Sequence, residues 1–306
     1  DAAPPPRALD PTGVYALRSA IALRPPAAAA PLLATLADAA DGADDPTRFV
    51  LDRLIASLPA GLPRTIATAA APYLAAYLQA RLAELAPQLA PGVATLVHGI
   101  TRAASHLDTL ETLRVDRAGA ATRTITGVVV RVGDHDTALA LADAGLGELV
   151  ATTSARLAAG APLAIAAHRV RLPYAALLRL AIDRAIAPAI APGAHDLAGA
   201  IAGLVDCGRL AIALADHLGV GAPATYRTAC QVAATALASE LDARIAALGA
   251  APLTLELAGT AEAVDHDGDG RVDALLGGQW TGALLDGDAR APIDGGGFTG
   301  ALAAGS

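Results

Sequence analysis

The spacing of apolar residues along this chain changes period several times. Between residues 13 and 23, apolar side chains recur at every second position, which predicts a β-strand. The same alternation returns at 107–115, 122–132, 146–157 and 163–172. Because short polar turns separate these later stretches, they predict an antiparallel meander.

Helical spacing fills two blocks between the strands. Asp45 followed by Pro46 is typical of a helix start, and the apolar stripe that follows ends at Pro59. Further helices are predicted at 64–89, 93–104, 174–190, 197–218 and 225–248. Helices in blocks favour the α+β class over a doubly wound parallel sheet. We therefore expect a strongly curved antiparallel sheet packed on two blocks of amphipathic helices.

The domain organisation follows from the same pattern. Residues 1–12 contain the run Pro4-Pro5-Pro6 and are interpreted as a processed N-terminus with a short stiff tether. Residues 13–306 are long enough to form one α+β domain, and a weaker alternative is a division into halves at 13–172 and 173–306.

A short stretch near the C-terminus has the spacing of a metal-binding loop. Acidic side chains stand at loop positions 1, 3, 5 and 9, which are Asp265, Asp267, Asp269 and Asp273. Gly270 stands at position 6, where such a loop turns sharply, and this oxygen-rich pattern suits Ca²⁺. The stretch resembles both the EF-hand loop and the D-x-D-x-D-G-x-x-D loop of integrin-type repeats. The EF-hand has a bidentate Glu at position 12, whereas this chain has Leu276.

The residues on both sides of this loop alternate with a period of two, at 253–263 and again at 272–276. We therefore expect a C-terminal calcium-loop β-hairpin in which the four carboxylates and the carbonyl of Arg271 bind Ca²⁺ in a structural role. The alternative is an ordinary solvated turn, because Asp and Gly also favour turns. Strand-like pieces at 279–285 and 298–302 follow the hairpin.

Composition restricts the compartment and the partners. The net charge of −8 and the absence of a basic stripe argue against a nucleic-acid partner. Cys207 and Cys230 are the two cysteines, which is compatible with one disulfide in an oxidising compartment, although they stand at unequal distances from the turn expected at 219–223. No stretch reaches the roughly 20 apolar residues of a membrane span, so we expect a soluble protein or one held by a lipid anchor outside this sequence.

The search for a catalytic constellation is negative. The sequence contains no nucleophile elbow, no metalloprotease helix motif, no Walker-type loop and no dinucleotide fingerprint. Ser105, His106 and Asp108 are close in sequence, but members of a catalytic triad normally converge from different elements. His168 is interpreted as a core histidine satisfied by a backbone carbonyl. We therefore do not expect an enzyme.

The order of strand, long helix, curved antiparallel strands and helices with a cysteine pair resembles the tubular lipid-binding superfamily. The segments 278–282 (Gly-Gln-Trp-Thr-Gly) and 297–300 (Gly-Phe-Thr-Gly) resemble uncharacterised exported proteins of GC-rich bacteria. These resemblances imply a lipid-binding or lipid-transfer protein of the cell envelope, without catalytic residues and without a binding residue that can be carried over.

Our leading expectation is a non-enzymatic carrier of a hydrophobic, lipid-like molecule, exported to the periplasm, the outer membrane surface or the exterior. It requires a cavity between helices and sheet, and the alternative is that these layers pack into a closed core. A second hypothesis is a calcium-stabilised structural or adhesion module at the cell surface. A third is an envelope enzyme that uses His106 or His168.

Overall fold

The computed structural model describes residues 8–41, 87–219, 222–249 and 253–303, together with a few isolated positions between 42 and 86. The helices predicted from Asp45 and at 64–89 lie almost wholly outside the described residues, as do residues 1–7 of the expected tether.

The described part of the chain forms one antiparallel sheet of ten strands. Their bounds are Gly13–Ala22 (β1), His106–Val115 (β2), Ala120–Val132 (β3), His135–Ala140 (β4), Leu149–Arg156 (β5), Leu163–Leu172 (β6), Leu253–Val264 (β7), Ala274–Asp286 (β8), Ala289–Pro292 (β9) and Gly295–Leu302 (β10). The five strands predicted by alternation before residue 173 are thus present. The two short strands β4 and β9, which we did not predict, each pair on one side only, with β3 and β8.

The sheet closes on itself. Strand β10 pairs with β8 on one side and with β1 on the other, where the ladder runs from Tyr15–Leu302 to Ala22–Gly295. Eight strands therefore complete a ring in the order β1, β2, β3, β5, β6, β7, β8, β10. The expected curved antiparallel meander and the α+β class are confirmed, and the curvature is complete.

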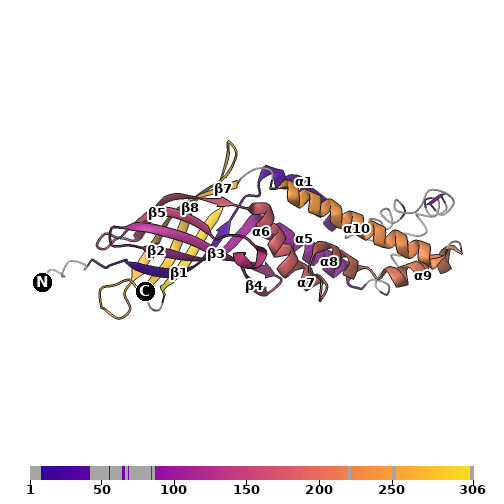
Figure 1. Cartoon of the computed structure of the whole chain (residues 1–306), viewed down its shortest axis with the longest axis horizontal. Coiled ribbons are helices and arrows are strands. Elements are labelled where there is room, and N and C mark those ends of the chain that lie inside the picture. Colours follow the sequence, from indigo (N-terminus) through magenta and orange to yellow (C-terminus); the bar gives the residue numbers. More distant parts are fainter. Residues whose placement is uncertain are drawn as a thin grey trace.

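The helices are inserted between β1 and β2 and between β6 and β7. The first insertion contains Ala30–Asp41 (α1) and Leu89–Ser105 (α5). The second contains Tyr174–Ala181 (α6), a π-helical turn at Ile182–Ile186, Ala187–Ile190 (α7), Leu197–Leu204 (α8), Cys207–Leu218 (α9) and Pro223–Ala247 (α10). Both insertions leave the same end of the closed sheet and extend away from it (Figure 1). The helices thus continue the sheet lengthwise, whereas we had expected them to be layered on its face.

The helix predicted at 197–218 is divided in two. Helices α8 and α9 meet at a bend of 41°. The side chain of Asp206 caps α9 by accepting hydrogen bonds from the backbone N–H groups of Gly208 and Arg209, both at 3.0 Å. The break therefore lies at Val205 and Asp206, between the end of α8 and the start of α9.

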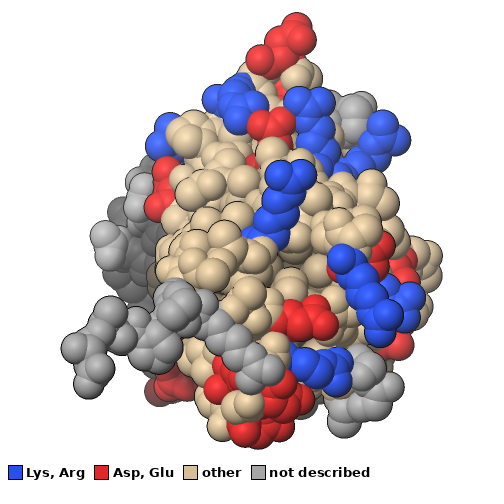
Figure 2. Space-filling view, turned by 90° about the vertical axis from the view of Figure 1, so that its left-hand side faces the viewer, with Lys and Arg blue, Asp and Glu red and all other residues tan. Residues whose placement is uncertain are grey.

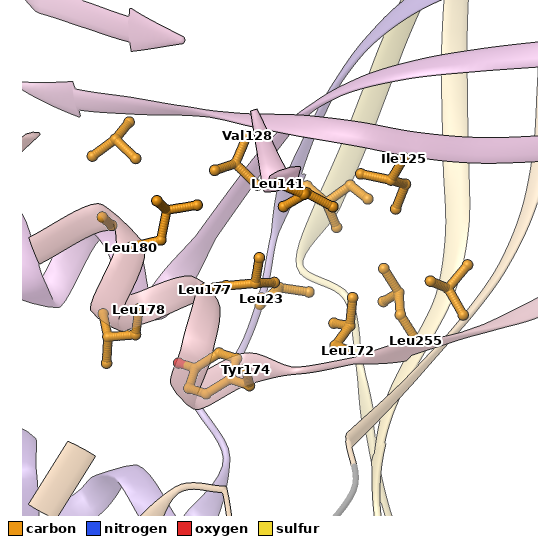
Figure 3. Close-up of a cluster of buried hydrophobic side chains, with 14 of the residues drawn as sticks. Leu23, Ile125, Val128, Leu141, Leu172, Tyr174, Leu177, Leu178, Leu180 and Leu255 are labelled. Carbon is orange, nitrogen blue, oxygen red and sulfur yellow. The ribbon is translucent and has the colours of Figure 1, made fainter. Parts of the chain in front are cut away.

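One apolar core runs from the interior of the closed sheet into the base of the helices. Leu172 and Leu255 from the sheet and Leu177 and Leu178 from α6 all belong to this core (Figure 3). The hydroxyl group of Tyr174 donates a hydrogen bond to the carbonyl of Ala104 at 2.5 Å and so joins α6 to α5. Burial raises the pKa of Tyr174.

A disulfide joins Cys207 to Cys230, with the Cα atoms 5.7 Å apart, and links α9 to α10. The predicted pairing is therefore present, and it indicates an oxidising compartment outside the cytoplasm. Among the described helices, none alone has the length and apolarity needed to cross a membrane, and only the bent pair α8 and α9 meets these criteria when taken together.

Candidate functional site

A groove opens where the closed sheet meets the helices. Strands β5 and β6 pair regularly only at Ala155–Ile165 and Arg156–Ala164, and β6 is irregular between Ile165 and His168. Beyond this short ladder, towards the helices, lies a hollow of about 550 Å³. Its walls come from the start of β5, the end of β6, the start of α6 and the end of α10.

The lining of this groove is mainly apolar. It consists of Glu148, Leu149, Val150, Val170, Arg171, Leu172, Pro173, Tyr174, Ala175, Ala176, Leu248 and Gly249. Val150 is 57% exposed and is the most exposed large hydrophobic side chain in the described part of the chain. The volume is within the usual range for small-molecule sites, about 300–1,000 Å³. The groove therefore offers apolar surface to a guest of that size.

A second cleft, which lies between the sheet and the helices, is much smaller. This cleft is bordered by β2, β3 and α6 and measures about 40 Å³, which is room for a few water molecules. Its apolar walls include Val128, Leu172 and Leu177 (Figure 3). Figure 2 shows the opposite end of the molecule, where the atoms drawn in colour leave no open mouth into the sheet. A lipid-sized guest fits the external groove better than this cleft.

The interior of the closed sheet contains a buried charged network that the sequence analysis missed. Glu111 on β2 is 3% exposed and Arg123 on β3 is completely buried. Arg123 donates two hydrogen bonds to the Glu111 carboxylate, at 2.5 and 2.6 Å, and Thr109 donates another to the same carboxylate. The only sequence signal is that these polar residues fall on the inward positions of alternating strands.

His168 on β6 completes this network. Its Nε2 atom lies 3.2 Å from Nη1 of Arg123, and its Nδ1 atom lies 3.0 Å from the carbonyl of Ala166. Arginine can only donate, so Nε2 accepts and the proton resides on Nδ1. Burial lowers the pKa of His168, and the Arg123 charge lowers it further, against the opposing effect of the Ala166 carbonyl. The expectation of a core histidine bonded to a backbone carbonyl is confirmed.

Trp280 covers the network from β8. Its ring lies 4.5 Å from Cζ of Arg123 and 4.4 Å from the ring of Phe298. The indole N–H donates to the hydroxyl group of Ser19 at 3.1 Å. Every charged or polar member of this interior is thus bonded to another, and all are sealed from solvent. The network is therefore not accessible to a substrate.

The acidic loop joins β7 to β8 and has the predicted hairpin geometry. Carboxylate oxygens of Asp265, Asp267 and Asp269 lie within 4.8 Å of one another. Asp273 is outside this group, and its carboxylate accepts the backbone N–H of His266 at 2.7 Å. Arg271 is exposed, and its backbone N–H donates to Asp269 at 2.7 Å.

The donor set of this loop is compatible with a calcium ion. Burial opposes ionisation of Asp265, but the backbone N–H groups of Gly270 and Gly268 prevail and lower its pKa. These bonds, at 2.8 and 2.7 Å, preorganise the carboxylate while leaving lone pairs for a cation. Three acidic residues with oxygen donors only fit a hard cation better than a soft metal.

The loop also holds the beginning of the first strand. The backbone N–H of Asp10 donates to the carbonyl of Gly270 at 2.9 Å, and the N–H of Val272 donates to the carbonyl of Asp10 at 3.0 Å. The hydroxyl group of Tyr15 reaches the carbonyls of Pro11 and Val272. The last residues of the expected tether are therefore docked against the acidic loop.

Ser105 and His106, the other candidate catalytic residues, are in contact with each other. Ser105 Oγ lies 2.9 Å from His106 Nδ1, but the same hydroxyl group donates to the backbone carbonyl of Thr101 at 2.9 Å. The hydroxyl group has a single proton, so it donates to only one of these two acceptors at a time. Apart from His168, the histidines are all exposed.

Comparison of the chain with family models, with curated proteins and with solved structures finds no match. The resemblance to tubular lipid-binding proteins therefore has no support beyond the arrangement of elements. The case for a function depends on the geometry of the groove, the buried network and the acidic loop.

Proposed function

We propose that this protein binds a hydrophobic ligand without catalysing a reaction, and that the groove between β5, β6 and α6 is the binding site. The observation that carries this proposal is Val150, the most exposed large hydrophobic side chain described, which lines a groove of about 550 Å³. A guest that covers Val150 removes apolar surface from water and gains roughly 25 cal/mol per Å² buried. A lipid-like molecule is the guest that the composition and the order of elements suggest.

A fluorescent fatty-acid analogue, titrated into the purified protein, tests this proposal. Val150→Asp should weaken binding at least tenfold, because a carboxylate in the apolar wall must be desolvated by the guest. Val232→Asp is the matched control, since Val232 on α10 is 51% exposed and does not line the groove. Val150→Thr keeps the β-branched shape without adding a charge, so it separates the effect of the carboxylate from an effect of misfolding. Equal affinity of all four proteins would refute the groove as the site.

A second candidate function is favoured by a separate observation. The acidic loop is bonded to the segment that leads into β1, and the carbonyl of Asp273 accepts the N–H of Leu302 at the end of β10. We infer that Ca²⁺, held by Asp265, Asp267 and Asp269, ties together the first, seventh, eighth and last strands. The protein would then be a calcium-stabilised structural or adhesion module of the cell surface.

Thermal unfolding with and without Ca²⁺ tests this second candidate. Saturating Ca²⁺ should raise Tm, because an ion that binds only the folded state adds about 2.7 kcal/mol at a hundredfold excess over Kd. Asp267→Asn should abolish the increase, whereas Asp288→Asn, in an exposed turn outside this loop, should not. A Tm that is independent of Ca²⁺ would exclude this role, and it would leave the groove proposal intact.

A further inference from the structure

Two charged side chains line the groove, one from the β5 side and one from the β6 side. Arg171 lies on β6 between the buried residues Val170 and Leu172, and Glu148 directly precedes β5. Both are exposed. Within the described part of the chain, neither one forms an ion pair with the other or with a third residue.

The neighbouring arginine on the same face of β6 is different. Arg169 stands opposite Glu256 on β7 and pairs with its carboxylate at 2.8 Å, while the second oxygen of Glu256 accepts from Arg290 at 2.7 Å. Arg171 stands opposite Thr254, which carries no charge. The charge of Arg169 is thus paired with Glu256 on the neighbouring strand, whereas the guanidinium of Arg171 remains available at the groove.

The two unpaired charges define which headgroup the groove suits. A guanidinium presents a planar set of donors to a carboxylate or phosphate, and a carboxylate attracts an ammonium group. A purely anionic headgroup would be attracted by Arg171 but repelled by Glu148. A purely cationic headgroup would be attracted by Glu148 but repelled by Arg171. A headgroup with both charges satisfies both walls.

Building on the proposed function, we propose that the ligand is a single-chain amphiphile with a zwitterionic headgroup. The anionic group binds Arg171 and the cationic group faces Glu148. The chain lies against the accessible apolar lining of the groove, which includes Leu149, Val150 and Ala175.

Isothermal titration calorimetry with four detergents of one chain length, each below its micelle concentration, tests this inference. The probes are dodecylphosphocholine, dodecanoate, dodecyltrimethylammonium and the uncharged dodecyl maltoside. We expect dodecylphosphocholine to bind most tightly. Arg171→Gln and Glu148→Gln should each weaken its binding about twofold to fivefold, the range of a partly exposed ion pair, and should leave dodecyl maltoside unchanged. Arg169→Gln is the matched control and should change neither.

The possible outcomes separate this inference from the proposed function. If dodecanoate or dodecyltrimethylammonium binds as tightly as dodecylphosphocholine, or if Arg171→Gln behaves like Arg169→Gln, the zwitterionic headgroup is wrong and a hydrophobic groove remains. If none of the four probes binds, the proposed function fails as well.

Discussion

The interior of the closed sheet and the groove at its helical end use charge in opposite ways. Inside the sheet, Glu111 and Arg123 are bonded to each other and to their neighbours, with no exposed surface on either side chain. At the groove, Glu148 and Arg171 are exposed and without an ion-pair partner among the described residues. A buried charge must be paired to be tolerated, whereas an exposed charge can remain available for a ligand. The chemistry of the residues is the same, and burial decides their role.

Removal of Arg123 should have the largest effect on stability. Arg123→Met leaves the Glu111 carboxylate buried without its partner, which should lower the free energy of unfolding by about 3–5 kcal/mol. Urea denaturation measures this change. The double variant Glu111→Leu/Arg123→Met should recover part of the loss, because it leaves no unpaired charge. If the double variant is as unstable as Arg123→Met, the loss of stability comes from packing around Trp280 and not from the unpaired charge.

The packing that covers the network should be the next most sensitive feature. A Cβ atom added at Gly259 would lie 2.5 Å from the Trp280 ring, which stands directly across the β7–β8 ladder. Gly259→Ala should therefore lower the free energy of unfolding by about 1–3 kcal/mol. Gly147→Ala, where no atom lies within 4 Å of the added Cβ, is the control. Thermal unfolding of both variants tests this prediction, and equal Tm values would contradict the close contact.

The sealed network should also make stability depend on pH through His168. Its pKa lies below the ordinary 6.5, so folding favours the neutral imidazole. The free energy of unfolding should therefore be highest above pH 6.5 and should decrease as the pH falls from there towards the lowered pKa of the folded state. In His168→Gln, the glutamine can still accept from Arg123 and donate to Ala166. The free energy of unfolding of this variant should therefore decrease less steeply as the pH falls. Parallel slopes in urea titrations across this range would exclude His168 as the source.

The smallest change in stability should come from the groove. Arg171→Gln removes an exposed side chain without an ion-pair partner, so the free energy of unfolding should stay within about 0.5 kcal/mol of the wild-type value. The same urea titration used for Arg123→Met provides the comparison. A loss of more than about 1 kcal/mol would mean that Arg171 has a structural role like that of the buried network.

Much of the fold could be predicted from local pattern. The alternation at 163–172 has the same bounds as β6, and the helix predicted at 174–190 appears as α6, a π-helical turn and α7. The predictions were less accurate where a polar residue overrode the apolar pattern. Asp206 caps a new helix and divides the one predicted at 197–218, which a count of apolar residues does not reveal.

The candidate sites were less predictable. The acidic loop could be recognised, because its ligands are close in sequence and their spacing carries the signal, although binding of Ca²⁺ stays a prediction. The groove could not be recognised, since Val150 and Arg171 come from two strands that diverge only beyond a short ladder. Glu111 and Arg123 were overlooked because charged residues in a strand are normally assigned to the solvent face.

The sequence by itself determined the local properties of this protein: the strand alternation, most helix positions and the acidic loop. These depend on residues within a few positions of one another, so backbone periodicity is sufficient to predict them. Only the tertiary structure decided that β1 and β10, from opposite ends of the chain, close the sheet, and that this closure buries Arg123 while leaving Arg171 exposed. Strand pairing between distant residues is not encoded in local periodicity, and the inside of the sheet exists only after the last strand has paired with the first.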